Sequence, residues 1–178
     1  MTRRKLVIVV GLFALLTLIC LYFLVPRPVI RTPENATISS ILIQCHPYYQ
    51  DTAEDSFNWV PETEEDQAVA QQIVEYLSQC QERRTLRWKF QEPPLSWKCM
   101  YIYIDDTRQS TFPRERCVIL GPSQATAPDQ PEDCLDTVNL SCWSMGQGVW
   151  GRFQGKLEDP SAIRSFVLDA LNLPGDFM

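Results

Sequence analysis

The chain has 178 residues and a net charge of −6, because 22 acidic residues outnumber 16 basic ones. Binding to DNA, RNA or an anionic membrane surface needs basic patches that neutralise phosphates. The only basic cluster in the sequence alternates with apolar residues, as the solvent face of a strand does, and consists of Arg83, Arg84, Arg87 and Lys89. We therefore predict no nucleic-acid partner.

An apolar run of 20 residues, Leu6–Val25, is the first predicted element and follows three basic residues at positions 3–5. As a helix it spans roughly 30 Å, the thickness of a bilayer's hydrocarbon core. A cleaved signal peptide has a shorter apolar stretch and small residues before the cleavage site, which are not evident here. Cys20 would be the lipidated residue of a lipoprotein signal, but it follows the bulky Ile19, so we interpret it as a small apolar helix residue. The run predicts an uncleaved signal anchor.

The distribution of charge predicts the orientation of this anchor. Basic residues on its N-terminal side favour a cytoplasmic N-terminus, although Arg27 and Arg31 on the other side reduce the difference. We therefore predict a single-pass plasma-membrane protein with an extracellular C-terminal domain, and the lipid bilayer is its first expected partner, through Leu6–Val25. The predicted parts are a cytoplasmic stub, the membrane anchor, a stiff Pro-containing spacer and the domain, at residues 1–5, 6–25, 26–37 and 38–178.

The domain is predicted to begin with a strand and an amphipathic helix. The strand lies near 38–45 and ends before Pro47, because proline cannot donate to a ladder. Thr63 followed by Asp66 resembles a capping box, which marks the start of a helix. Apolar residues then recur at three- and four-residue spacing and define one buried stripe: Val69, Ile73, Tyr76, Leu77 and Cys80.

Strands and a final helix are predicted for the rest of the chain. The strands lie at 85–90, 97–104, 117–120, 138–145 and 149–157. The strand at 97–104 has apolar residues on both faces and should be central, and short turns imply antiparallel pairing. Asp159 as N-cap and Pro160 at the first position predict a helix that ends near Leu171. The predicted fold class is α+β, an antiparallel sheet of about five to six strands with one helix packed across it and a C-terminal helix.

The cysteines are candidates for disulfides, because six of them lie outside the apolar run and an even number in an exported domain favours pairing. They are Cys45, Cys80, Cys99, Cys117, Cys134 and Cys142. Six cysteines permit 15 pairings, and the sequence does not choose among them. Proximity along the chain suggests Cys99–Cys117 and Cys134–Cys142, which leaves Cys45–Cys80. Buried free thiols are the alternative, since several of these cysteines occupy apolar positions.

Few residues suit metal binding or acid–base chemistry. The sequence contains no C-x-x-C or H-x-x-x-H pair, so we predict no metal site and no cofactor. His46 is the only histidine, and a capping or turn role explains it better than general-base catalysis. Neighbouring carboxylates are candidates for a catalytic pair, although turns explain them more simply: Asp105, Asp106, Glu132 and Asp133. These observations favour a non-enzymatic protein.

Trp150 is the strongest candidate for contact with a ligand or partner. If Val149, Phe153 and Leu157 point into the core, strand alternation places Trp150 on the solvent side together with Arg152. An exposed tryptophan can bind sugars, peptides or a protein surface, but a lone exposed aromatic is also an ordinary surface residue. Trp150 and Arg152 are therefore the predicted contacts.

The order of these elements resembles that of a known group of proteins. The N-terminal anchor, the strand ISSILIQ, the helix EEDQAVAQQIVEYLSQ and the strand PPLSWKCMYIYI resemble small membrane-anchored extracytoplasmic domains of unknown function from Gram-positive bacteria of the clostridial group. The resemblance spans Ile38–Leu171. It implies a cystatin-like outline and supplies no catalytic residues.

Three functions fit these observations. The first is a membrane-anchored, non-enzymatic module that binds a protein, a peptide or a cell-envelope component. The second is a hydrolase with acidic side chains in a cleft, and the third is an inhibitor of an extracellular enzyme, suggested by the cystatin-like outline. A pocket with converging carboxylates of raised pKa would favour the hydrolase, whereas an apolar patch around Trp150 would favour binding.

Overall fold

The structure is a computed structural model of the chain. It describes residues 3–45, 56–86, 98–106, 114–121, 137–144, 147–150, 153–175 and 177. Within these ranges it describes the backbone alone at 3–4, 45, 85–86, 106, 114–115, 137–144, 147–150 and 153–154. All statements below refer to these residues.

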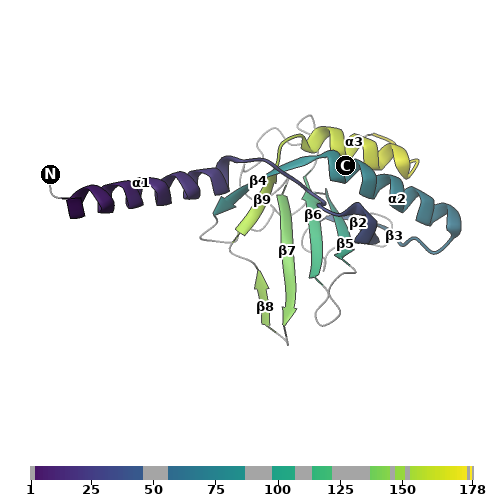
Figure 1. Cartoon of the computed structure of the whole chain (residues 1–178). Helices are drawn as coiled ribbons and strands as arrows, with labels where there is room; N and C mark the ends of the chain where they lie inside the picture. Colours follow the sequence, from purple (N-terminus) through teal and green to yellow (C-terminus); the bar gives the residue numbers. More distant parts are fainter. Residues whose placement is uncertain are drawn as a thin grey trace.

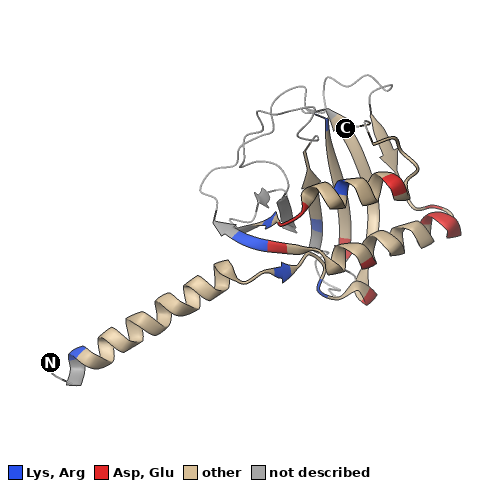
Figure 2. Ribbon diagram, turned by 90° about the horizontal axis from the view of Figure 1, so that it is seen from above, with Lys and Arg blue, Asp and Glu red and all other residues tan. Residues whose placement is uncertain are grey.

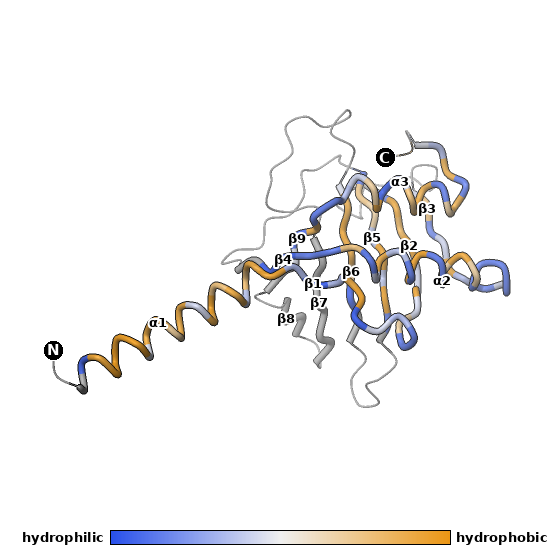
Figure 3. The backbone as a smooth tube through the Cα atoms, turned by 45° about the horizontal axis from the view of Figure 1, so that its top comes forward, coloured by the Kyte–Doolittle hydropathy of each residue, from blue (hydrophilic) through white to orange (hydrophobic). Residues whose placement is uncertain are grey.

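Helix α1 (Arg3–Leu24) projects away from the rest of the molecule (Figure 1). Its sequence is apolar over most of its length (Figure 3), and its side chains are exposed from Lys5 to Tyr22, whereas α2 and α3 bury one apolar face. By length and composition α1 could cross a membrane, as the sequence predicts. An exposed apolar helix of this kind is stable in lipid, because its backbone hydrogen bonds are all internal.

A single antiparallel sheet forms the body of the domain. Its strands lie in the order β1-β4-β9-β7-β6-β5-β2-β3, and β8 pairs with β7. The strands are β1 (Arg27–Pro28), β2 (Ala36–Cys45), β3 (Phe57–Trp59), β4 (Gln81–Leu86), β5 (Lys98–Asp106), β6 (Arg114–Leu120), β7 (Thr137–Ser144), β8 (Gln147–Trp150) and β9 (Phe153–Leu157). This confirms the α+β class. The strands outnumber those expected because β1 and β3 are very short and the last predicted strand is divided into β8 and β9.

Two helices cover one face of this sheet, α2 (Glu64–Gln79) and α3 (Pro160–Ala170) (Figures 1 and 2). The capping box of α2 is confirmed, since the Asp66 N–H donates to Thr63 Oγ1 and the Thr63 N–H donates to Asp66 Oδ2, both at 3.1 Å. Asp159 caps α3 as predicted by accepting from the Ala162 N–H. The helices meet where the Tyr76 and Phe166 rings stack with centroids 3.9 Å apart.

The core lies between these helices and the sheet, and β5 is central, as predicted. Met100, Ile102 and Ile104 of β5 are buried under the helices. The opposite face of β5 contributes Cys99 and Tyr101 to a second, smaller buried cluster. Both faces of this strand are therefore covered, which explains its nearly continuous apolar sequence.

The segment at 26–37 differs from the expected spacer, because it is packed onto the domain. Val29 is fully buried and Ile30 is 4% exposed, and both belong to the main core. The Val29 N–H donates to the Cys80 carbonyl at 3.0 Å, and β1 pairs with β4. The burial of two apolar residues thus attaches this segment to the domain, although most of its residues are polar or proline. The chain passes from the end of α1 into the domain core within a few residues.

Strand β4 also differs from its prediction. It begins at Gln81, directly after the C-cap of α2 at Cys80, rather than at Thr85. The run of charged residues at 82–84 hides this start in the sequence, because charged residues are seldom buried and Glu82 is. Residues 87–90 of the predicted strand lie outside the described residues.

Candidate functional site

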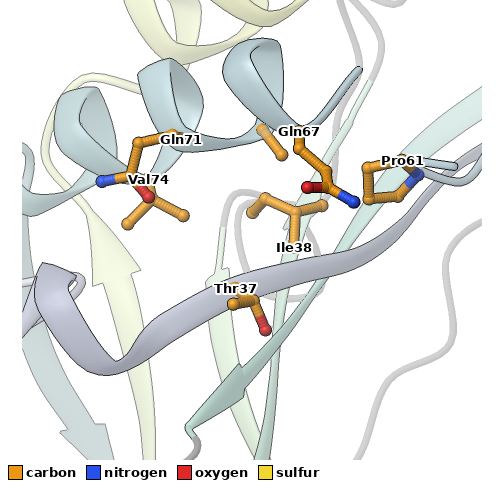
Figure 4. A pocket seen from close by; sticks show the side chains of 7 residues that line it. Thr37, Ile38, Pro61, Gln67, Gln71 and Val74 are labelled. Atoms are coloured by element: carbon orange, nitrogen blue, oxygen red, sulfur yellow. The ribbon is translucent and has the colours of Figure 1, made fainter. Parts of the chain in front are cut away.

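A pocket of about 360 Å³ lies between α2 and the N-terminal half of β2 (Figure 4). Four of its residues come from α2 at helical spacing, so they share one face of that helix. Figure 4 shows the Gln67 amide beside the Pro61 ring, with Ile38 between the helix and Thr37. The lining residues are Thr37, Ile38, Pro61, Gln67, Ala70, Gln71 and Val74.

The shape of this pocket follows from the ends of three elements. The Thr63 capping box fixes the first turn of α2, which carries Gln67 just beyond it. Strand β3 pairs only with Ile41–Ile43 of β2, and Pro61 follows soon after β3 ends. Along residues 36–40, the described strands therefore leave one edge of β2 without a partner strand. This open edge borders the pocket at Thr37 and Ile38.

The chemistry of the pocket is that of neutral polar groups. Gln67 offers an amide that both donates and accepts hydrogen bonds, and Thr37 offers a hydroxyl. Gln71 Nε2 donates to Glu75 Oε1 at 3.2 Å, which leaves its amide oxygen as an acceptor. Apolar side chains complete the wall, which is the usual composition of a binding site. None of the seven lining residues is ionisable at neutral pH, so none of them can act as a general acid or general base there. The neutral polar lining suits the binding of uncharged groups.

A second polar site surrounds Glu82 on β4, which is 5% exposed. Burial raises the pKa of this carboxyl above its ordinary value of 4.5, whereas the guanidinium groups of Arg116, Arg31 and Arg27 act in the opposite direction. Arg116 Nη2 lies 3.9 Å from Glu82 Oε1, and its Nη1 donates to the Val29 carbonyl. The site therefore ties the segment after α1 to the sheet.

Gly155 on β9 makes room for this carboxylate. A Cβ atom at position 155 would overlap the Glu82 carboxyl group. Gly155 lies opposite Arg84 in the register of β4 and β9, two positions along from the pair Glu82 and Leu157, so it faces the same side of the sheet as that pair. Glycine is thus required by close approach of a side chain rather than by an unusual backbone angle.

Two of the three suggested cysteine pairs, Cys45–Cys80 and Cys99–Cys117, do not form. Cys80 is a free thiol whose Sγ donates to the Tyr76 carbonyl at 3.3 Å, so Cys45–Cys80 is absent. Cys117 lies opposite Tyr103 in the ladder, four residues from Cys99, a separation of roughly 13 Å that exceeds the reach of a disulfide. The side chains of Cys45 and Cys142, and all of Cys134, lie outside the described residues, and for these the disulfide state stays a prediction.

The thiol of Cys80 is also poorly suited to catalysis. Burial raises its pKa to about 11, and the nearby Asp159 carboxylate acts in the same direction. The thiolate is the nucleophilic form, and it is scarce at neutral pH when the pKa is this high. Cys80 is therefore a structural thiol at the end of α2.

Trp150 is the last residue of β8 and lies opposite Ser141 of β7 in the ladder. The structure describes its backbone alone, and Arg152 lies outside the described residues, so their contact role stays a prediction. The same holds for His46, Glu132 and Asp133. Asp105 and Asp106 end β5 and are not among the residues that line the pocket.

Sequence reasoning missed the residues that form both sites. The helical spacing i, i+3, i+4, i+7 that identifies the buried stripe also holds for the four pocket residues of α2, which are Gln67, Ala70, Gln71 and Val74. Glutamines along the edge of that stripe could therefore have indicated the pocket. Glu82 gave no such signal, because its burial depends on Gly155 and Arg116, far away in the sequence.

Comparisons with known proteins identify no relative, since no family model, curated protein or solved structure matches this chain. The resemblance to anchored clostridial domains therefore stays a prediction.

Proposed function

We propose that this chain is a membrane-anchored, non-enzymatic binding module that holds an uncharged, extended segment of a protein or peptide partner in the pocket between α2 and β2. The observation that carries the proposal is a pocket lined by two amides, one hydroxyl and apolar groups, with no ionisable side chain. Amide side chains pair well with peptide N–H and C=O groups, because both are neutral donors and acceptors.

The open edge of β2 supports an extended partner. An added strand can hydrogen-bond to the backbone of an unpaired edge, while its alternate side chains enter a neighbouring pocket. The described edge at 36–40 and the pocket adjoin each other through Thr37 and Ile38. The register of β2 shifts between Ile38 and Ser40, which limits the length of any such pairing.

The hydrolase alternative has less support. Burial raises the pKa of the Glu82 carboxyl group, which is a property that a general acid requires. However, Glu82 does not line the pocket. Its carboxyl group is enclosed by Gly155 and faces Arg116 instead. The inhibitor alternative is supported only by the cystatin-like outline that the sequence suggests.

A peptide selection tests the binding proposal. A random displayed peptide library would be selected on the full chain reconstituted in lipid nanodiscs, and the selected peptides resynthesised for affinity measurement. We expect ligands rich in uncharged polar residues, and affinity at least about tenfold weaker for Gln67→Ala with Gln71→Ala, since two hydrogen bonds are lost. Gln72→Ala is the matched control, because Gln72 is exposed on the same helix outside the pocket. Equal affinity for both variants, or cleavage of the peptides, would contradict the proposal.

The extracellular orientation is part of the same proposal and rests on the basic residues at 3–5. A protease added to intact cells should remove the domain and leave α1 protected. Digestion of the domain only after the cells are opened would show that it lies in the cytoplasm.

A further inference from the structure

Three elements converge on the aromatic ring of Tyr22, near the C-terminal end of α1. The Arg27 guanidinium lies 4.7 Å from the ring centroid, and the Arg84 guanidinium of β4 lies 4.4 Å from it. Arg27 Nη2 also donates to the Tyr22 carbonyl at 3.4 Å. Two cations on one aromatic ring hold the end of the helix against the sheet.

These cations lie at the depth of lipid headgroups if α1 spans a bilayer. Tyr22 is two residues from the end of α1, where tyrosines gather at the membrane interface. Strand β1 begins at Arg27 and the core begins at Val29, so the chain has no free length to lift the sheet from the surface. Arginines in this position extend toward the phosphates above the ring.

Further basic residues surround this point. Arg31 and Arg83 are exposed, and Lys156 is exposed opposite Arg83 in the ladder of β4 and β9. Figure 2 shows the basic segments where α1 joins the sheet. We call these residues the exit cluster: Arg27, Arg31, Arg83, Arg84 and Lys156.

Among the described residues, nearby acidic groups neutralise the exit cluster only in part. Glu158 pairs with Arg83 at 2.6 Å, and Glu82 is buried beneath the surface. The five cations of the cluster thus exceed these two carboxyl groups, although the whole chain carries −6. A local excess of cations beside a helix that could cross a membrane is attracted to anionic lipids in the same plane.

We propose that the exit cluster binds the phosphates of anionic phospholipids in the leaflet at the C-terminal end of α1. Arg27 and Arg84 would hold one headgroup phosphate between them, because planar guanidinium groups bind phosphate oxygens through paired hydrogen bonds. Arg31, Arg83 and Lys156 would attract further anionic lipids through longer-range electrostatics. This binding does not depend on what occupies the pocket between α2 and β2.

Lipid retention by the full chain tests the proposal. The chain would be reconstituted in nanodiscs with equal amounts of phosphatidylglycerol and phosphatidylcholine, and the lipids that stay bound would be counted by native mass spectrometry. Each cation near an anionic surface favours binding by about fivefold. We expect phosphatidylglycerol to be enriched on the native chain, and Arg27→Gln with Arg84→Gln to lower that enrichment by roughly five- to twentyfold.

Lys98→Gln is the matched control. Lys98 also lies over an aromatic ring, 4.1 Å from the Phe177 centroid, and its loss removes one charge and one cation–π contact. It begins β5, four strands from β4, which is roughly 19 Å away across the sheet. Its replacement should leave the enrichment unchanged. Equal enrichment on the native chain and the double variant, or an equal fall with Lys98→Gln, would overturn the proposal.

A salt titration of the native chain keeps the test valid if the double variant fails to fold. Between about 0.05 and about 0.5 M NaCl the Debye length falls severalfold, so enrichment should fall steeply. Enrichment that does not respond to salt, or none at low salt, would also overturn the proposal.

Discussion

The pocket between α2 and β2 and the junction between α1 and β4 place polar groups in opposite circumstances. At the pocket, Gln67 is exposed and lines space that a ligand could fill. At the junction, Glu82 is buried among arginines and against Gly155, and its position is set by its neighbours. Polar groups that are already constrained by neighbours contribute to stability, whereas exposed ones remain available for binding. Changes at the junction should therefore alter unfolding, and changes at the pocket should alter affinity.

Gly155→Val should have the largest effect and would break the junction directly. The new side chain would occupy the place of the Glu82 carboxyl group, so that either the carboxyl group or the β4–β9 ladder has to move. Overpacking and the displaced buried charge together should lower the free energy of unfolding by about 3 kcal/mol. Urea denaturation of the detergent-solubilised chain, followed by tryptophan fluorescence, measures this change.

The same substitution at Gly175 is the control, because no atom lies within 4 Å of a Cβ at that position. Gly175→Val should change the unfolding free energy by less than about 0.5 kcal/mol. A similar loss at both glycines would show that Gly155 matters for backbone freedom and not for the room it leaves to Glu82.

Arg116→Met should have the next largest effect. It removes the cation 3.9 Å from Glu82 and the donor to the Val29 carbonyl, while it keeps most of the side-chain volume. We expect a loss of about 2 kcal/mol, less than for a fully buried pair because the Arg116 side chain is 24% exposed. The double variant with Glu82→Gln should recover part of this loss, and no recovery would contradict a role through Glu82.

The pH dependence of unfolding tests the contribution of Glu82 to the stability of the junction. The pKa of Glu82 is raised in the folded chain, so its contribution is fully present below the ordinary value of 4.5 and is lost as pH rises through the folded pKa. Relative to Glu82→Gln, the native chain should therefore lose stability as pH rises above 4.5. Parallel stability curves for the two proteins would contradict this sign.

The parts of the fold that the sequence predicts are those fixed by local interactions. The capping box at Thr63 and the N-cap at Asp159 each depend on a residue only three positions away. The apolar residues on both faces of β5 likewise predict that both faces are buried. Val29 was missed because its burial requires a hydrogen bond to Cys80, 51 positions later. Glu82 was missed for the same reason, since charged residues are seldom buried unless distant partners enclose them.

Thr63→Ala should cost less than either change at the junction, because it affects the first turn of one helix. The loss of the N-cap acceptor for the Asp66 N–H should lower the unfolding free energy by about 1 kcal/mol. Ser161→Ala, at an exposed position in the first turn of α3, is the control and should have little effect.

The cap also gives the opposite response to pH from Glu82. Hydrogen bonds from the side chain and backbone of Thr63 lower the pKa of Asp66 below its ordinary value of 3.8. This contribution is present above pH 3.8 and is lost as pH falls through the folded pKa. Thr63→Ala should reduce the loss of unfolding free energy as pH falls below 3.8. An unchanged loss over this pH range would mean that the cap does not act through Asp66.

Gln67→Ala should have the smallest effect on stability. Gln67 is exposed, and the structure gives its side chain no hydrogen bond that holds the fold, so the unfolding free energy should change by less than about 0.5 kcal/mol. The same variant should weaken binding of the selected peptides, because its amide is lost from the pocket wall. A residue that affects affinity but not unfolding is what a binding site requires. A large loss of stability would instead make Gln67 part of the scaffold, and the contrast between pocket and junction would then fail.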